Sequence, residues 1–186
     1  KSTHLIITYG TSWIYRHKTN NQIVANCHKV LQNQFEKELL STENIENAIQ
    51  NTINLVQKIN PNRKFIFTIS PVRHIKDGFV ENQISKAHLI AAIHNPKFTI
   101  HNYFPSYELM MDELRDYRFY ANDMLHPSAL AIDFIWIKFF ENYVAEKEFP
   151  TMQQVCDIQK ALMHRPFDSN SEQHQNFLLK IENKIA

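Results

Sequence analysis

Short apolar runs alternate with longer segments of helical periodicity along this chain. Three runs rich in β-branched and aromatic residues predict strands at His4–Tyr9, Lys64–Ile69 and Phe98–Tyr103. The first two runs are apolar at nearly every position, so we expect these strands to be buried on both faces. The polar residues from Arg16 to Asn21 predict a loop after the first strand.

Apolar residues at helical spacing predict a helix that follows a cap at Ser41 or Thr42 and stops at Asn60-Pro61-Asn62. Further helical patterns cover Val80–His94, Ala129–Tyr143 and Thr151–Met163. The residues expected on the buried faces are Ile84, Ala87, His88 and Ala91 in the second helix and Leu130, Phe134, Ile137 and Phe140 in the third.

This alternation of strands and helices predicts an α/β protein, a three-layer α/β/α sandwich around a parallel sheet. We expect one domain over residues 1–150 and a helical extension over residues 151–186. Ligands of parallel sheets bind beyond the carboxyl ends of the strands. The segments expected at that edge are Gly10-Thr11-Ser12-Trp13, Ser70–His74, Tyr103–Ser106 and Asp123–His126.

Composition narrows the classes of partner. The formal net charge is +1 without a basic cluster, which argues against nucleic acid. No apolar run approaches the roughly 20 residues of a membrane span. Cys27 and Cys156 lie far apart and read as free thiols, a weak indication of a reducing, cytoplasmic compartment. The compartment and the oligomeric state stay open, and because the chain opens on a charged stub before an apolar strand, we expect the natural N-terminus upstream.

Glycine is scarce. The chain has two glycines where average usage predicts about thirteen. Each glycine should therefore meet a special backbone requirement, and at Gly10 we expect a positive φ or an approach too tight for a Cβ.

Asp123 and His126 stand three residues apart, directly before a helix that begins with proline. In such a turn a carboxylate can hold one imidazole nitrogen and stabilise the imidazolium, which leaves the other nitrogen as a general base. The alternative is a helix-capping Asp beside a surface His, since the bare pattern also occurs by accident.

Other residues are weaker candidates for a functional site. Arg73 and His74 follow the second strand and could bind a substrate carboxylate, phosphate or acyl oxygen; alternatively, Arg73 pairs with an acid of residues 108–116. Ser12 mimics a nucleophile elbow but is better explained as lining the site or capping the turn. Asn26-Cys27-His28 is better explained by loop packing than by a Cys/His nucleophile.

The tyrosines and the histidines bear on which ligands the protein could bind. Tyrosines concentrate between Tyr103 and Tyr120, which suits either stacking on a sugar-like substrate or packing of a loop onto the sheet. The ten histidines are scattered, so we predict no metal site and no cofactor.

Longer phrases carry a family resemblance. DMLHPS resembles the last block of SGNH hydrolases, in which Asp and His complete a Ser-His-Asp triad. YGTSWIY, NCHK, SPVRHIKDGFVENQISKAHL, YFPSYELMMDELRDYRFYANDMLHPS and HRPF, in this order, resemble the GSCFA family of bacterial proteins, a branch of the SGNH-like fold. The match covers nearly the whole chain.

The resemblance implies a serine esterase or acyl hydrolase that acts on an ester substrate, a small molecule or an acylated carbohydrate. It gives His126 the role of base and Asp123 that of orienter. The family's Gly-Ser-Cys-Phe-Ala segment, with the presumed nucleophilic serine, does not occur in the sequence. Gly10-Thr11-Ser12 instead resembles a later SGNH strand whose Gly-x-Asn element helps to build the oxyanion hole, with serine in place of asparagine.

Three other functions stay open. An acyltransferase of the same fold differs only in the acceptor of the acyl group. A non-catalytic carbohydrate-binding relative and a metal-dependent hydrolase are the alternatives from other classes.

Overall fold

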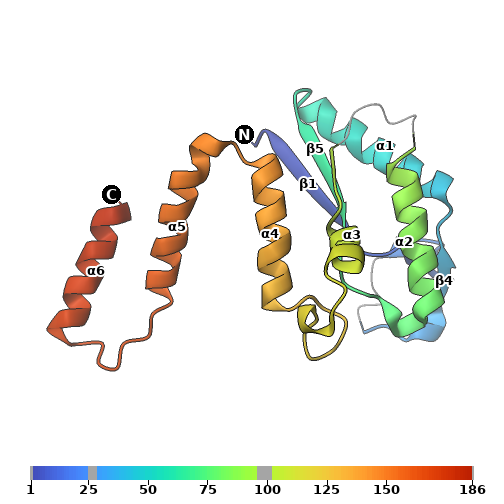
Figure 1. Cartoon of the computed structure of the whole chain (residues 1–186). Coiled ribbons are helices and arrows are strands. Elements are labelled where there is room, and N and C mark those ends of the chain that lie inside the picture. The colour runs from blue at the N-terminus through green and yellow to red at the C-terminus, as the bar shows by residue number, and fades with distance from the viewer. Residues whose placement is uncertain (1, 25–28, 96–101, 186) are drawn as a thin grey trace. The chain divides into compact units, whose positions relative to one another are not determined.

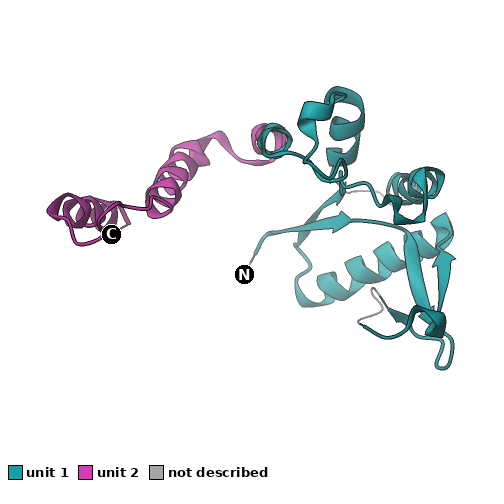
Figure 2. Cartoon of the chain, turned by 90° about the horizontal axis from the view of Figure 1, so that it is seen from below, with its two compact units in different colours: residues 1–136 teal, residues 137–186 magenta. Residues whose placement is uncertain are grey.

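The computed structural model describes residues 2–24, 29–95 and 102–185. The chain divides into two compact units, Lys1–Trp136 and Ile137–Ala186 (Figure 2). The boundary falls inside helix α4 (Ala129–Tyr143). The predicted division into 1–150 and 151–186 stays a prediction.

A parallel sheet forms the centre of the first unit. Its strands are β1 (His4–Tyr9), β5 (Lys64–Ile69) and β6 (Asn102–Phe104), in the order β1-β5-β6 (Figure 1). The α/β class and the parallel sheet are thus confirmed, and the first two strands have the predicted bounds. Of the predicted third strand, residues 98–101 lie outside the described residues.

Helices α1 (Thr42–Ile59) and α2 (Phe79–Ile93) pack against one face of this sheet (Figure 1). The Ser41 side chain caps α1 by accepting from the Asn44 N–H at 3.2 Å, as the sequence predicted. Isoleucines four residues apart then lie on one face. The shared core contains Ile45, Ile49 and Ile53 of α1, Phe65, Phe67 and Ile69 of β5, and Leu89, Ala92 and Ile93 of α2.

The expectation that β1 is buried on both faces is wrong. His4, Ile6 and Thr8 are exposed, and Ile6 retains 51% of its accessible surface. The exposed residues alternate with Leu5, Ile7 and Tyr9, which pack against the core shared with α1 and α2, so in the described residues only one face of β1 is covered. An apolar run therefore indicated a strand correctly but overstated its burial.

At the carboxyl end of β5, the strand contacts α3 (Ser106–Glu108), which is followed by the π-helical turn η3 (Leu109–Glu113). Ser106 Oγ donates to Ile69 O at 2.6 Å and lies 2.8 Å from Thr68 Oγ1. A second apolar cluster, Met110, Leu114 and Ala131, follows in the chain.

A second, antiparallel sheet surrounds the predicted polar loop: Arg16 and His17 lie in a strand, and residues 18–21 form a turn and coil as predicted. Its strands are β2 (Trp13–His17), β3 (Ile23–Val24) and β4 (Phe35–Leu39), in the order β3-β2-β4. Polar cross-strand pairs hold it: Arg16 forms an ion pair with Glu38 at 2.8 Å, and Lys37 lies 4.9 Å from the Trp13 ring centroid. These contacts compensate for the low apolar content that suggested a loop.

The buried faces of two helices differ from the prediction. In α2, Ile84, Ala87 and Ala91 are exposed, and the buried residues are Asn82, Ser85, Lys86, Leu89, Ala92 and Ile93. In α4, Leu130 and Ile137 are about half exposed, whereas Ala131 is buried and Phe134 is partly buried. The face of α2 is polar at its amino-terminal half because it contacts backbone carbonyls and hydroxyls at the strand ends.

The second unit contains α5 (Phe149–Leu162) and α6 (Glu172–Ile185), which contact each other. Short helical turns elsewhere are η1 (Gln32–Gln34), η2 (Ile75–Asp77), η4 (Tyr117–Phe119) and η5 (Glu146–Glu148). None of the helices in the described residues is long and apolar enough to cross a membrane. Cys156 on α5 is a free thiol, whereas Cys27 lies outside the described residues.

Candidate active site

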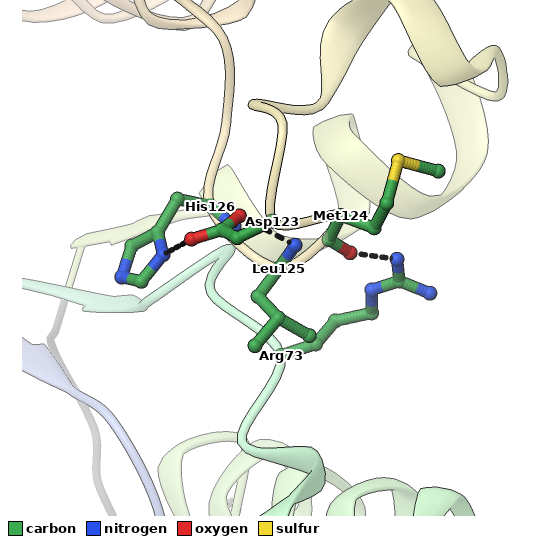
Figure 3. Close-up of polar contacts among 5 residues, drawn as sticks. All are labelled: Arg73, Asp123, Met124, Leu125 and His126. Carbon is green, nitrogen blue, oxygen red and sulfur yellow. Dashed lines mark hydrogen bonds and ion pairs between the residues drawn. The ribbon is translucent and has the colours of Figure 1, made fainter.

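Asp123 and His126 are in direct contact, as their spacing predicted. Asp123 Oδ2 lies 2.6 Å from His126 Nδ1, and Figure 3 shows the carboxylate facing the ring. The other carboxylate oxygen, Oδ1, accepts from the Leu125 and His126 backbone N–H groups at 2.9 and 3.0 Å. Both side chains are exposed. Because Oδ2 accepts at Nδ1, imidazole Nε2 remains for another partner.

The carboxylate of Asp123 is held in its charged form. Hydrogen bonds from the backbone N–H groups of His126 and Leu125, followed by the bond from the His126 side chain, lower the pKa of Asp123 to about 2. Asp123 is therefore anionic at neutral pH, as an orienting partner of a catalytic imidazole must be.

The turn that joins the two residues is closed by backbone hydrogen bonds. Ala121 N–H donates to His126 O at 2.8 Å, and Met124 N–H donates to Ala121 O at 2.9 Å. Tyr120 and Pro127 form an isolated antiparallel bridge just outside them. Met124 has φ 61°, a left-handed conformation that side chains other than glycine adopt at a cost.

Arg73 reaches this turn from the loop that follows β5. Its backbone N–H donates to Leu125 O at 3.3 Å, and its guanidinium donates to Met124 O (Figure 3). The guanidinium carbon also lies 4.5 Å from the centroid of the Tyr120 ring. In the described residues the partners of Arg73 are thus carbonyls and a ring, not an acid of residues 108–116; its predicted contact with substrate stays a prediction.

His74 and Gly10 lie side by side. Gly10 does not have a positive φ, but a Cβ at this position would lie 3.3 Å from His74 Nε2, a tight approach. The expectation of a positive φ at Gly10 is thus wrong, and the approach to His74 is tight without excluding a Cβ. The His74 backbone N–H donates to the buried Asn82 side chain at 2.8 Å, which fixes the start of the loop that carries the ring.

The environment of His74 favours a neutral imidazole. Burial lowers the pKa of His74 below its ordinary value of 6.5, and the positive charges of Lys86 and His126 lower it further. His74 directly follows Arg73, whose backbone N–H binds Leu125 O in the turn of the Asp123–His126 pair. The carboxyl edge of the sheet thus brings Gly10, His74, Arg73 and the Asp123–His126 pair into one region.

Ser12 belongs to the core and not to this surface. Only 1% of it is accessible; its backbone N–H donates to Ser85 Oγ at 2.8 Å, and its Oγ donates to Ser85 O at 3.1 Å. This burial fits a residue that secures the turn after β1, and it leaves no surface for the predicted contact with substrate. The Cys27/His28 alternative lies outside the described residues.

Lys86 is a residue of this region that sequence reasoning missed. It is 1% accessible, and its Nζ donates to Gly10 O at 2.7 Å and to Ser70 O at 2.8 Å. Burial lowers the pKa of Lys86 to about 8. Its position in the sequence could have indicated it, because Lys86 stands four residues after Asn82 and therefore on the same, buried face of α2. A search for apolar residues at helical spacing does not find a buried lysine.

A shallow, open groove borders the pair. Its lining consists of Tyr120, Ala121, Asn122, Asp123, Pro127, Ser128 and Ala129. Across the described parts of the chain, no three His, Cys, Asp or Glu side chains cluster in a way that could hold a metal ion.

Comparison with known proteins gives two matches to family models. The model of the GSCFA family matches residues 1–139. A second model, the C-terminal domain of GSCFA domain proteins, matches residues 155–186. No curated protein and no solved structure matches the chain.

Proposed function

This chain belongs to the GSCFA family, and we propose that it forms part of an SGNH-like hydrolase that cleaves ester bonds. The observation that carries the proposal is the 2.6 Å contact between an anionic Asp123 and His126 Nδ1 at the carboxyl edge of a parallel sheet. Such a carboxylate–imidazole pair is the base component of a Ser-His-Asp mechanism.

In the proposed reaction His126 Nε2 takes the proton of a serine hydroxyl as its oxygen bonds to the ester carbonyl carbon. The bond between that carbon and the alcohol oxygen then breaks, and the alcohol leaves with the proton from His126. A water molecule attacks the acyl-serine with the same help, and the acid is released. Asp123 stabilises the imidazolium in both steps, the formation and the hydrolysis of the acyl-serine.

Ser12 is buried and is not assigned as the nucleophile. The resemblance implies a serine in a Gly-Ser-Cys-Phe-Ala segment, and the 186 residues do not contain it. Gly10 and the neutral His74 would border the acyl group; a neutral imidazole can donate a hydrogen bond to a developing oxyanion.

The open groove beside Asp123 admits water or an alcohol, so the structure favours neither hydrolysis nor transfer. An acylated carbohydrate is the proposed substrate class, with Tyr120 as the aromatic surface of the groove. An acyltransferase would share every residue and differ only in accepting an alcohol in place of water.

The proposal is tested in the complete gene product by labelling with a fluorophosphonate, which reacts with activated serines. We expect labelling in the unmodified protein and its loss in His126→Ala, with His4→Ala as a control at an exposed histidine of β1. Absence of labelling would favour the carbohydrate-binding alternative. Ester hydrolysis that stops with a chelator would favour a metal-dependent hydrolase, and product transfer to added alcohol would favour the acyltransferase.

A further inference from the structure

The turn between Asp123 and His126 has hydrogen bonds of its own and also contacts Arg73, a residue outside it. Met124 sits between the pair with φ 61°, and a residue with a side chain adopts this conformation only where its surroundings impose it. Met124 is 38% exposed, so its own side chain gives limited packing to hold the backbone. If the turn relaxed, Asp123 would lose the two backbone donors that aim its second oxygen at His126.

Arg73 contacts this backbone at two consecutive residues. Its main chain binds the carbonyl of Leu125, and its guanidinium binds the carbonyl of Met124. The Tyr120 ring stacks on the guanidinium at 4.5 Å and restricts where it can point. Figure 3 shows Arg73 on the side of the turn opposite the His126 ring, so it contacts the backbone and leaves the imidazole free.

We propose that Arg73, stacked on Tyr120, is a positioning residue that holds the Met124 backbone in its left-handed conformation and thereby keeps Asp123 on His126 Nδ1. Arg73 acts through the turn and does not touch the reacting atoms. Its backbone lies in the loop after β5, so the clamp also ties the Asp123–His126 pair to the carboxyl end of the central strand. The consequence for catalysis rests on the proposed function, but the geometric claim does not.

The tautomer of His126 reports the geometry directly. The carboxylate at Nδ1 enforces the Nδ1–H tautomer, whereas a neutral histidine without this partner favours Nε2–H. The side-chain ¹⁵N chemical shifts of His126 in the 186-residue chain, at mildly alkaline pH, distinguish the two forms. This measurement requires no catalytic activity.

We expect Arg73→Ala to shift His126 from Nδ1–H toward a mixture dominated by Nε2–H. The matched control is Arg118→Ala, which removes an exposed arginine of the same region whose side chain contacts Asp116 and the Phe119 ring. It should leave the tautomer unchanged. Tyr120→Leu removes the stacking alone and should give a smaller shift in the same direction, which keeps the test open if Arg73→Ala fails to fold.

Rescue separates a positioning role from general damage. Glycine adopts a positive φ without strain, so Met124→Gly in the Arg73→Ala background should restore the Nδ1–H tautomer. Retention of Nδ1–H in a folded Arg73→Ala chain would overturn the proposal. So would a shift that Met124→Gly does not reverse.

Activity adds a second readout in the complete gene product. Arg73→Ala should lower kcat for ester hydrolysis by about tenfold to a hundredfold, because a small misplacement of the base costs that much, and change KM little. An inactive unmodified protein would defeat the proposed function and leave the tautomer test intact. A tautomer shift without loss of kcat would defeat the catalytic consequence alone.

Discussion

Replacement of Lys86 by methionine tests how the two strand ends of the site are joined. Lys86 Nζ donates to Gly10 O after β1 and to Ser70 O after β5. Methionine has a similar length and apolar body but no donor, so it fills the space and leaves both carbonyls without this partner.

The magnitude follows from two opposed effects. Each hydrogen bond from a charged donor contributes about 1.5–3 kcal/mol, so the substitution removes about 3–6 kcal/mol. Burial of the ammonium destabilises the folded state. The lowering of the pKa of Lys86 from 10.5 to about 8 corresponds to a cost of about 3 kcal/mol. This cost is absent in the methionine variant. We therefore expect a net loss of about 0–3 kcal/mol in the free energy of unfolding, centred near 1.5 kcal/mol or about 3–6 °C in Tm.

The assay is urea unfolding at neutral pH followed by the fluorescence of Trp13, in a Trp136→Phe background that leaves one tryptophan. The Trp13 indole N–H donates to Glu81 O at 3.3 Å, on the helix that carries Lys86, so it reports the relevant unit. Lys76→Met, at an exposed lysine, is the control. A folded Lys86→Met variant that is clearly more stable than its parent would refute this account of the strand ends.

The pH dependence of the same difference has a definite sign. Between about pH 8 and 10.5 the unfolded chain keeps a proton that folded Lys86 has released, so stability from this group rises with pH over that window. The part of the stability that comes from deprotonated Lys86 is lost as pH falls through about 8. The stability gap between the parent and Lys86→Met should therefore widen from pH 8 to pH 10, and a gap that narrows would contradict the lowered pKa.

The remaining predictions concern the carboxylate and the buried serine. The ¹³C chemical shift of the Asp123 carboxyl group should titrate with a midpoint near 2. Because this pKa is below its ordinary value of 3.8, any stabilisation from the Asp123–His126 contact should be complete above pH 3.8 and lost as pH falls through about 2; a midpoint at the ordinary value would contradict the backbone hydrogen bonds. Ser12→Ala should retain ester hydrolysis in the complete gene product and lower the free energy of unfolding by about 0.5–1.5 kcal/mol, because it removes the hydrogen bonds of Ser12 Oγ to Ser85. Loss of activity in a folded Ser12→Ala protein would restore Ser12 as a catalytic candidate.

The sequence predicted features that depend on local pattern. Helix α1 followed from isoleucines spaced by four and a capping serine, and β1 and β5 followed from compact apolar runs. The contact between Asp123 and His126 followed from their spacing before a helix, because the turn that joins them is local.

Features that depend on distant partners were missed. β2 and β4 pair with each other and share the ion pair of Arg16 with Glu38, 22 residues away, and the sequence analysis predicted no strand at either place. The buried face of α2 carries Lys86 because its acceptors are backbone carbonyls 76 and 16 residues away, which no helical periodicity reveals. Burial of Ser12 likewise depends on Ser85, 73 residues further along the chain.

The most direct test of the central claim is the kcat/KM of the complete gene product for an aryl acetate, compared between the unmodified protein, His126→Ala and His4→Ala. Removal of the general base from a Ser-His-Asp enzyme lowers turnover on the order of 10⁶-fold. The account predicts a loss of at least about 10⁴-fold in His126→Ala, with His4→Ala unchanged and both variants folded. Hydrolysis by His126→Ala within about tenfold of the unmodified rate would contradict it.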